Sequence, residues 1–295
     1  MREQTEGLVL RGIGGFYYVE TADAVYTCRA RGAFRRQGLS PMAGDRVVIS
    51  VQPDGEGVLE QIQPRRNHLV RPPVANLDVL VLVASVCQPV TSTLVLDKMI
   101  AIAEKQGICP IVAVNKTDLG DPGMLLDTYR RAGMECFAVC GRDPSTLVPL
   151  RRRLAGLLSV FSGNSGVGKS SILNGLDPSL SLPTGEISQK LGRGRHTTRT
   201  AALYRLADGY VADTPGFSSL DIEQVESIGR EELADCFREF APYKGRCRFA
   251  GCAHYREPGC AVRQAVERGE IAQSRYDSYV TLYEAVKDKK EWEKP

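Results

Sequence analysis

Two different rhythms of hydrophobic and polar residues divide the chain. Residues 7–64 hold short apolar runs separated by glycine, proline and aspartate, without the spacing of an amphipathic helix. The expected strands are LVLRGIG (8–14), GFYYVET (15–21), AVYTCRARG (24–32), DRVVISV (45–51) and GVLEQIQ (57–63). Several short strands in so short a stretch are typical of a small closed β-barrel. We therefore predict an OB-fold barrel over residues 1–70.

From residue 77 the pattern changes to continuous apolar strands that alternate with amphipathic helices. Strands are expected at 77–85, 108–118, 135–140, 159–163 and 209–216, and helices at 93–107 and 124–133. Strands that are apolar on both faces, with helices between them, indicate a parallel sheet covered on both sides. We predict an α/β domain over residues 71–221, reached from the barrel through a linker rich in proline and arginine, 64–76.

The last part of the chain is helical and charged around a group of cysteines. It ends in a lysine-rich helix expected from about 273 to 291, so we predict a third, mainly helical unit over residues 222–295. The longest apolar run, VLVLVA (79–84), is far shorter than the roughly 20 residues of a membrane span, and the start MREQTEG lacks a signal core. We expect a cytoplasmic protein that acts as a monomer and has no membrane partner.

A glycine-rich loop after the strand at 159–163 has the pattern of a phosphate-binding loop. Gly163, Gly168, Lys169 and Ser170 have the required spacing, and a helix-like segment follows them. The glycines let backbone amides turn toward phosphates, Lys169 neutralises phosphate oxygens, and Ser170 ligates Mg²⁺. The residues assigned to the nucleotide are Gly163, Asn164, Ser165, Gly166, Val167, Gly168, Lys169, Ser170 and Ser171.

Two further motifs complete a guanine-nucleotide site. In the sequence DTPG, Asp213 is expected to hold Mg²⁺ through water and the Gly216 amide to sense the γ-phosphate, although DTPG alone is also a common turn. In the sequence NKTD, Asp118 can accept both the N1 hydrogen and the amine of guanine, a pairing that adenine does not offer. Asn115 is expected to tie the loop and contact the base, and the Lys116 stem to lie over the ring. The predicted ligands are therefore GTP or GDP with Mg²⁺.

The order of these motifs differs from that of an ordinary GTPase. NKTD at 115–118 precedes the phosphate loop at 163, which is followed by GRHTTR at 194–199 and DTPG at 213–216. A sheet can be cut and rejoined through its loops without losing the site, because the site depends on the arrangement in space. We conclude that the central domain is a circularly permuted GTPase.

Four metal-binding residues lie close together in the third unit. Cys247, Cys252, His254 and Cys260 offer three thiols and one imidazole within fourteen residues, with turn-forming glycine and proline between them. This donor set suits one structural, tetrahedral Zn²⁺ ion per chain. Buried free cysteines are the alternative interpretation.

Basic residues are grouped although the net charge is only +3. Such grouping indicates contact with nucleic acid, whereas a single group is also compatible with a solvated face. The groups are Arg29, Arg31, Arg35 and Arg36; Arg65, Arg66 and Arg71; Arg193, Arg195 and Arg199; and Lys244, Arg246 and Arg248.

Taken together, the barrel, the permuted motif order and the sequences GNSGVGKSS, GRHTTR, DTPGF and CRFAGCAHYREPGCAV resemble the ribosome small-subunit-dependent GTPase A family over essentially the whole chain. The resemblance implies a GTP hydrolase that binds the small ribosomal subunit and its rRNA, assists late maturation and leaves after hydrolysis. It also implies that Thr197 or Thr198 closes on Mg²⁺ and the γ-phosphate, that His196 has a catalytic role, and that the zinc unit helps the protein dock on RNA.

Two positions depart from an ordinary GTPase. Phe217 stands where a glutamine would orient the attacking water, which predicts slow hydrolysis without a partner. Cys140 stands in place of the usual Ser-Ala element behind guanine. His196 could instead be a solvated basic residue or an RNA contact.

Two other classes of function compete with the enzyme. A GTP-regulated RNA-binding module with little catalysis is kept open by Phe217. A small-molecule kinase that uses the phosphate loop is disfavoured by NKTD and by the lack of an evident acceptor site.

Overall fold

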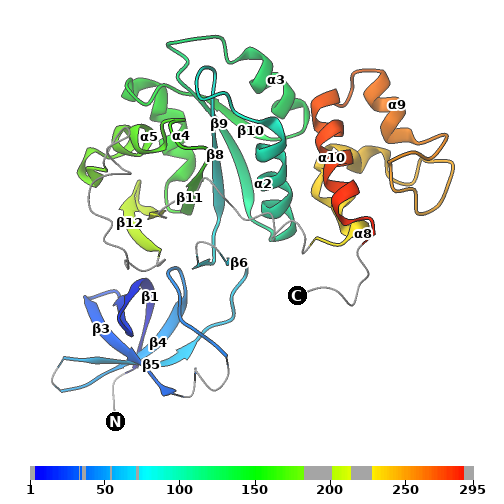
Figure 1. Ribbon diagram of the computed structural model, residues 1–295. Coiled ribbons are helices and arrows are strands. Elements are labelled where there is room, and N and C mark those ends of the chain that lie inside the picture. Colours follow the sequence, from blue (N-terminus) through cyan, green and yellow to red (C-terminus); the bar gives the residue numbers. More distant parts are fainter. Residues whose placement is uncertain are drawn as a thin grey trace.

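The computed structural model describes residues 4–32, 34, 38–53, 55–70, 73–182, 201–213 and 228–288. Figure 1 shows three units: a barrel at one end, a helix-covered sheet in the middle, and a helical unit against one side of that sheet. The barrel and the central sheet share one hydrogen-bonded sheet, because strand β1 of the barrel touches strand β12 of the central domain.

The barrel is closed, as the sequence predicts. Its strands run in the order β1-β2-β3-β5-β4, β4 returns to pair with β1, and β3 and β5 are parallel. Alternate side chains point inward, so that Val9, Val19, Val47, Ile49 and Leu59 are fully buried. The strands are β1 (Gln4–Ile13), β2 (Phe16–Glu20), β3 (Val25–Ala30), β4 (Arg46–Val51) and β5 (Gly57–Ile62).

The connector between barrel and sheet is hydrogen-bonded in itself and to the barrel. Strand β6 (His68–Leu69) pairs with β7 (Val74–Ala75), and the domain boundary expected after residue 70 falls between them. The Asn76 side chain donates to the carbonyl of Gly44 and accepts from the backbone N–H of Arg66, each at 2.9 Å. The described parts of the segment expected as a linker, residues 64–70 and 73–76, therefore form a structured joint.

Five parallel strands and one antiparallel strand form the central sheet, in the order β10-β9-β8-β11-β13-β12. The expected parallel arrangement is confirmed for the first five. Strand β12 was not predicted, because its Tyr204 and Arg205 are exposed and interrupt any apolar run. The strands are β8 (Val79–Ser85), β9 (Cys109–Asn115), β10 (Glu135–Ala138), β11 (Leu158–Ser162), β12 (Ala202–Leu206) and β13 (Gly209–Asp213).

Helices cover both faces of the sheet, which explains why its strands are apolar throughout. In β8, Leu80 and Leu82 face the core that includes α2 and α3, whereas Val79, Val81 and Val83 face the core that includes α4 and α5. The helices are α2 (Thr93–Lys105), α3 (Gly123–Arg131), α4 (Val148–Leu154) and α5 (Lys169–Leu176), with short 3₁₀ turns at Pro144–Leu147 and Pro178–Leu180.

The C-terminal unit shares the core that lies on the α2 side of the sheet. Phe237, Phe240 and Tyr279 pack on one another with ring centroids 4.9–5.4 Å apart and belong to the same buried cluster as α2. Helix α10 begins at Gln273, as expected, but ends at Val286 and contains no lysine. The expectation of a lysine-rich helix is therefore wrong within the described residues: Lys287 follows the end of the helix, and residues 289–295 lie outside the described part of the chain. The unit consists of α8 (Arg230–Leu233), α9 (Ala261–Glu267), α10 (Gln273–Val286) and 3₁₀ turns at Ala234–Cys236 and Arg238–Tyr243.

A buried ionic cluster joins three elements inside this shared core. Arg275 of α10 donates to Glu239 (2.7 and 3.1 Å) and to Asp97 of α2 (2.7 Å). The three side chains are at most 4% exposed. Burial raises the pKa of Asp97, an effect that the charge of Arg275 opposes. The arginine thus neutralises charge that could not otherwise be buried.

Among the described residues, no helix combines the length and the apolar character needed to cross a bilayer.

Replacing the central arginine should uncouple α10 from α2. We expect Arg275→Met to destabilise the protein by about 3 to 5 kcal/mol, because two carboxylates would stay buried without their partner. A carboxyl group whose pKa is raised in the folded state lowers the free energy of unfolding as pH rises. The destabilisation caused by Arg275→Met should therefore become smaller as pH is lowered from about 8 to about 5. Denaturant titrations at several pH values measure both effects.

The matched control is Arg268→Met, because Arg268 pairs with Glu270 at 2.8 Å while both side chains are about half exposed. It should destabilise the protein far less than Arg275→Met does, because an exposed ion pair contributes little to stability. Equal losses in the two variants would show that the buried cluster contributes no more than a surface ion pair.

Candidate functional site

The predicted nucleotide motifs meet at one edge of the central sheet. The loop of residues 163–168 follows β11, residues 116–118 follow β9, residues 139–143 follow β10, and Asp213 ends β13. These strands are parallel neighbours, so their carboxyl ends lie at the same edge (Figure 1). Ligands of open α/β sheets bind in this position.

The backbone of the phosphate loop takes a form that glycine permits. Gly163, Gly166 and Gly168 have φ angles of 149°, 82° and 97°. A Cβ atom on Gly168 would lie 2.2 Å from the side-chain nitrogen of Asn115, and one on Gly163 would lie 2.4 Å from the carbonyl oxygen of Val83. The loop therefore packs directly on the strands that carry the other motifs.

Lys169 curls back over this loop from the start of α5. Its Nζ donates to the carbonyl oxygens of Gly163 (2.6 Å) and Asn164 (2.9 Å). Burial lowers the pKa of this half-buried lysine. A phosphate oxygen at the loop would favour the charged form again. Ser165 is exposed, while Ser170 and Ser171 are half-buried at the start of α5.

Asn115 joins three loops through one buried amide. Its Nδ2 donates to the carbonyl of Val167 in the phosphate loop (2.8 Å), and its Oδ1 accepts from the backbone N–H of Gly141 (2.9 Å). Asn115 was expected to tie the loop, and these two hydrogen bonds connect its own loop to two others. The contribution of Gly141 could not be read from the sequence, where only a glycine after Cys140 marks the position.

The loop after Asn115 carries the residues that are predicted to read the base. Lys116 has a φ of 65°, and its Nζ donates to the carbonyl of Gln88 at 2.6 Å. Asp118 is exposed at the site and accepts from the thiol of Cys140 at 3.3 Å. Cys140 therefore contacts the carboxylate that is predicted to read guanine. Nothing in the sequence marks Gln88 as part of this region.

Several expected residues cannot be placed. Asp213 ends β13, next to β11, but its side chain lies outside the described residues, as do His196, Thr197, Thr198, Gly216 and Phe217. Ser170 and Asp213 both come from the edge of the sheet where the phosphate loop lies. A hydroxyl and a carboxylate oxygen are donors that suit Mg²⁺.

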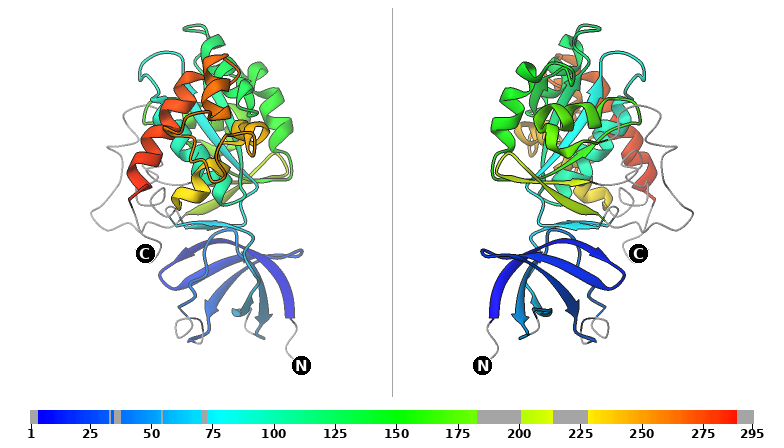
Figure 2. Two further views of the ribbon diagram at one scale, coloured as in Figure 1. Left: turned by 90° about the vertical axis from the view of Figure 1, so that its right-hand side faces the viewer. Right: turned by 90° about the vertical axis from the view of Figure 1, so that its left-hand side faces the viewer.

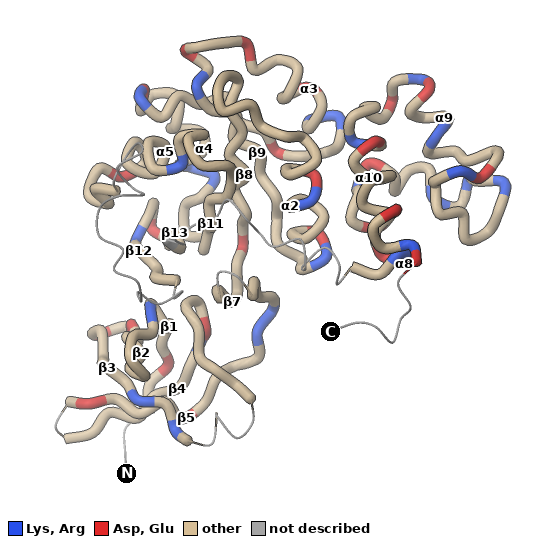
Figure 3. Tube along the Cα trace, in the orientation of Figure 1, with Lys and Arg blue, Asp and Glu red and all other residues tan. Residues whose placement is uncertain are grey.

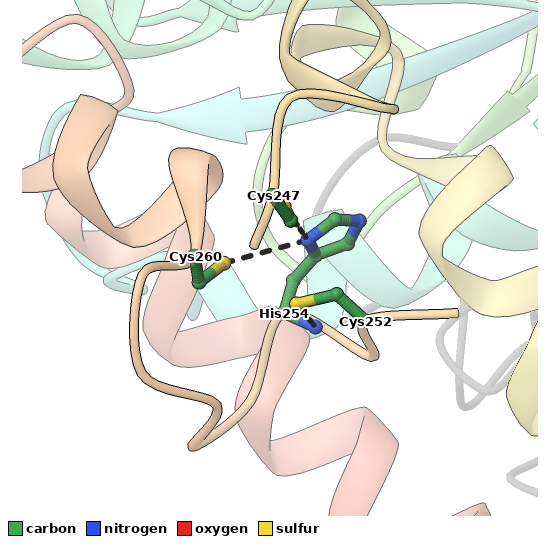
Figure 4. A group of neighbouring side chains, drawn as sticks. All are labelled: Cys247, Cys252, His254 and Cys260. Atoms are coloured by element: carbon green, nitrogen blue, oxygen red, sulfur yellow. Dashed lines mark hydrogen bonds between the residues drawn. The ribbon is translucent and has the colours of Figure 1, made fainter. Parts of the chain in front are cut away.

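The four predicted metal ligands come together in the C-terminal unit (Figure 4). Their ligand atoms all lie within 4.8 Å of one another. The thiols of Cys247 and Cys260 lie 3.6 and 3.4 Å from Nδ1 of His254, and the backbone N–H of His254 donates to the Cys252 sulfur at 3.4 Å. This group could hold one metal ion.

Aromatic residues and α10 support this candidate metal-binding group. The Phe240 ring meets the His254 ring edge-on with centroids 5.9 Å apart, and the Tyr276 hydroxyl donates to the carbonyl of His254 at 3.0 Å. Burial raises the pKa of Cys252 to about 12 and lowers that of His254. A bound cation would offset the cost of holding thiolates in this buried position.

Comparisons with known proteins match the whole chain. A model of the RsgA GTPase family matches residues 62–223, and a model of the RsgA N-terminal domain matches residues 6–59. The small ribosomal subunit biogenesis GTPase RsgA of Geobacillus thermodenitrificans is 44% identical over 291 residues, which cover 97% of this chain and 98% of that relative. The protein of the same name from Bacillus subtilis is 43% identical over 296 residues, with the same coverage.

Two solved structures share the architecture. YloQ, described as a circularly permuted GTPase, has a TM-score of 0.81 and 37% identity, covering 98% of this chain and 96% of that one. YjeQ from Thermotoga maritima has a TM-score of 0.82 and 35% identity, covering 98% and 100%. The permuted order and the resemblance derived from the motifs are confirmed, as is the expectation of a GTPase. The chain belongs to the RsgA GTPase family.

Proposed function

We propose that this chain hydrolyses GTP to GDP and phosphate, binds the small ribosomal subunit and its rRNA, and assists late maturation of that subunit. The names of the curated relatives support the connection with the subunit. The observation that carries the catalytic part is the Asn115 bridge, because it brings the phosphate loop and the base-reading loops into one site.

In this site Asp118 reads guanine, and the hydrogen bond from Cys140 supports the carboxylate in doing so. The stem of Lys116 lies along the base. The phosphate loop from Gly163 to Ser171 wraps the β-phosphate with its backbone amides, and Lys169 moves from the loop carbonyls to the phosphate oxygens. Each group binds or orients the nucleotide before any bond is broken.

Ser170 and Asp213 would hold Mg²⁺, which supplies positive charge at the phosphates. We assign Gly216 to the γ-phosphate and Thr197 or Thr198 to closure over the same group. His196 is proposed to orient the attacking water. Phe217 leaves the free enzyme without the glutamine that serves this purpose in Ras-like proteins, so hydrolysis depends on the docked state and is linked to release.

Contacts with rRNA are proposed on an outer face of the barrel. The guanidinium of Arg11 lies 4.4 Å from the Tyr18 ring centroid, and that of Arg29 lies 4.9 Å from the Phe16 ring centroid. Aromatic rings and arginines on such strands suit stacking on unpaired bases. Arg31 is less available, because it is paired with Glu60 at 2.5 Å.

The zinc-binding unit offers a second set of basic and aromatic groups, and Figure 3 shows lysines and arginines in the loops beside α9. Phe249 is 47% exposed with the Arg248 guanidinium 5.5 Å from its ring centroid, and Arg256 lies 4.6 Å from the ring centroid of Tyr255. We propose that Cys247, Cys252, His254 and Cys260 hold one Zn²⁺ ion that fixes these loops for docking.

We place the protein in the cytoplasm, since its relatives are named for biogenesis of the small ribosomal subunit. We also propose that it acts as a monomer. The second candidate is a GTP-regulated RNA-binding module with little catalysis, which Phe217 favours. Phosphate release at saturating subunit separates the two.

The base-reading role of Asp118 can be tested by exchanging its hydrogen-bonding pattern. We expect Asp118→Asn to weaken GTP binding by up to about 10⁴-fold and to improve binding of xanthosine triphosphate, whose 2-oxo group accepts from an amide. Competition binding with both nucleotides measures the change. Asp121→Asn is the control, because within the described part of the chain Asp121 accepts a hydrogen bond from the nearby backbone N–H of Gly123 and from no other motif residue. An unchanged preference for GTP would remove Asp118 from the base site.

Purified protein should contain one zinc per chain. Cys247→Ser should lose the metal and unfold the C-terminal unit more readily, because metal binding of this type contributes about 10 to 16 kcal/mol in small zinc peptides. Metal analysis and thermal unfolding with and without chelator measure the two effects. Cys136→Ser, outside the group, should keep its zinc. A folded, zinc-free wild type would contradict the proposal.

Small subunits, but not large subunits, should accelerate hydrolysis. We expect His196→Ala to keep nucleotide and subunit binding while losing most of the acceleration, because the water would be poorly positioned. A titration with subunits gives the plateau rate and the half-saturation point separately. If the plateau is unchanged and only half-saturation shifts, His196 is an RNA contact. If neither subunit accelerates wild type, the binding-module alternative is favoured.

A further inference from the structure

The β12–β13 hairpin of the central domain contacts the barrel directly. Arg11 of β1 pairs with Ala202, the first residue of β12. Glu20, the last residue of β2, accepts a hydrogen bond from Arg205 at 2.7 Å and another from the hydroxyl of Tyr210. One carboxylate of the barrel therefore holds both strands of the hairpin. Figure 2 shows the barrel strands directly below this part of the sheet.

Glu20 is the buried member of this contact. Its side chain is 18% exposed, whereas that of Arg205 is 68% exposed. Arg205 and Tyr210 face each other across the hairpin, with the guanidinium 5.2 Å from the ring centroid. A half-buried carboxylate that receives two donors from neighbouring strands fixes their relative position better than a solvent-exposed ion pair does.

The hairpin is also fixed to the strand that leads into the phosphate loop. The backbone N–H of Tyr210 donates to Leu157 at 2.8 Å, and the Ser159 hydroxyl donates to the carbonyl of Tyr210 at 3.1 Å. Strand β13 then runs in register with β11 and ends at Asp213, three residues after Tyr210. A displacement of Tyr210 would therefore move the strand that carries Asp213.

The barrel is attached at a second place through the connector around Asn76. Between barrel and hairpin lies a polar groove of about 330 Å³, lined among others by Glu6, Arg46 and Gln63. A body attached at two places cannot turn about one of them without breaking the other. Rotation of the barrel about the connector would therefore act first on the bonds of Glu20.

We propose that Glu20 is a positioning residue for GTP hydrolysis, which transmits the pose of the barrel through Tyr210 and Arg205 to strand β13 and Asp213. The inference rests on the proposed function, because it requires a subunit that docks on the barrel. Glu20 contacts Tyr210 near the start of β13, whereas Asp213 ends that strand, so Glu20 acts on the site only through the strand. It acts by keeping the end of β13 in the alignment that docking selects.

The test is a titration of small subunits against Glu20→Ala, with plateau rate and half-saturation read separately. We expect basal hydrolysis and half-saturation to stay at wild-type values and the stimulated plateau to fall about 3- to 30-fold, the range for single substitutions in coupled elements. The double variant Glu20→Arg/Arg205→Glu exchanges the two charges and should recover part of the plateau, whereas Glu20→Arg alone should not.

Glu104→Ala is the matched control, because Glu104 pairs with Arg238 at 2.7 Å across the other junction and is also 18% exposed. It should leave the plateau near wild type. Any of three results would overturn the inference while the wild-type protein is still stimulated by subunits. These results are a wild-type plateau in Glu20→Ala, an equal loss of plateau in Glu104→Ala, and no recovery of the plateau in the double variant. Absence of any stimulation in wild type would instead overturn the proposed function.

Discussion

The buried amide of Asn115 is the contact on which the nucleotide site depends. It comes from the end of β9 and bonds to Val167, 52 residues later, and to Gly141, 26 residues later. An amide offers a donor and an acceptor on one rigid group, so it can satisfy a carbonyl in one loop and an N–H in another. The close approach of Gly168 makes this possible, because any side chain there would collide with the amide. Cutting and rejoining the chain elsewhere leaves these contacts intact, which is why the permuted order is compatible with one guanine-nucleotide site.

The two appended units are attached to the central domain in different ways. The C-terminal unit shares a hydrophobic core with α2 and buries the Arg275 cluster in it, so it cannot separate without exposing charge and apolar surface. The barrel is joined by the buried hydrogen bond from Asn76 to Gly44, by Ala43 and the connector residues Leu69 and Val74 in the same core, and by the bonds of Glu20 beside a polar groove. The two attachments differ in their ion pairs, because the Arg275 pairs are buried whereas Arg205, the partner of Glu20, is 68% exposed.

Both appended units contact elements of the central domain that lead to the nucleotide site. Strand β13 lies between β11, which leads to the phosphate loop, and β12, which touches the barrel. On the other side, α2 follows the loop whose Gln88 holds Lys116, and the same helix carries Asp97 toward the C-terminal unit. Each appended unit thus contacts an element that continues into the nucleotide site.

Much of this protein can be read from its sequence alone. The period of the barrel strands, the alternation of strands and helices, the phosphate loop, NKTD and the four candidate metal ligands are local patterns. Such patterns follow from backbone geometry and donor chemistry. Strand β12 could not be predicted, because its exposed Tyr204 and Arg205 break the apolar pattern. The expected linker proved to be a structured joint, because Asn76 finds its partner in Gly44 of the barrel.

Only the tertiary structure decided which distant side chains meet. Arg275 and Asp97 are 178 residues apart, and Glu20 and Tyr210 are 190 residues apart. Cys140 likewise reaches Asp118 only because β9 and β10 are neighbours in the sheet. Such contacts arise when strands and helices with local signals of their own are packed into one core. They leave no periodic trace in a single sequence, because each partner taken alone reads as an ordinary polar residue.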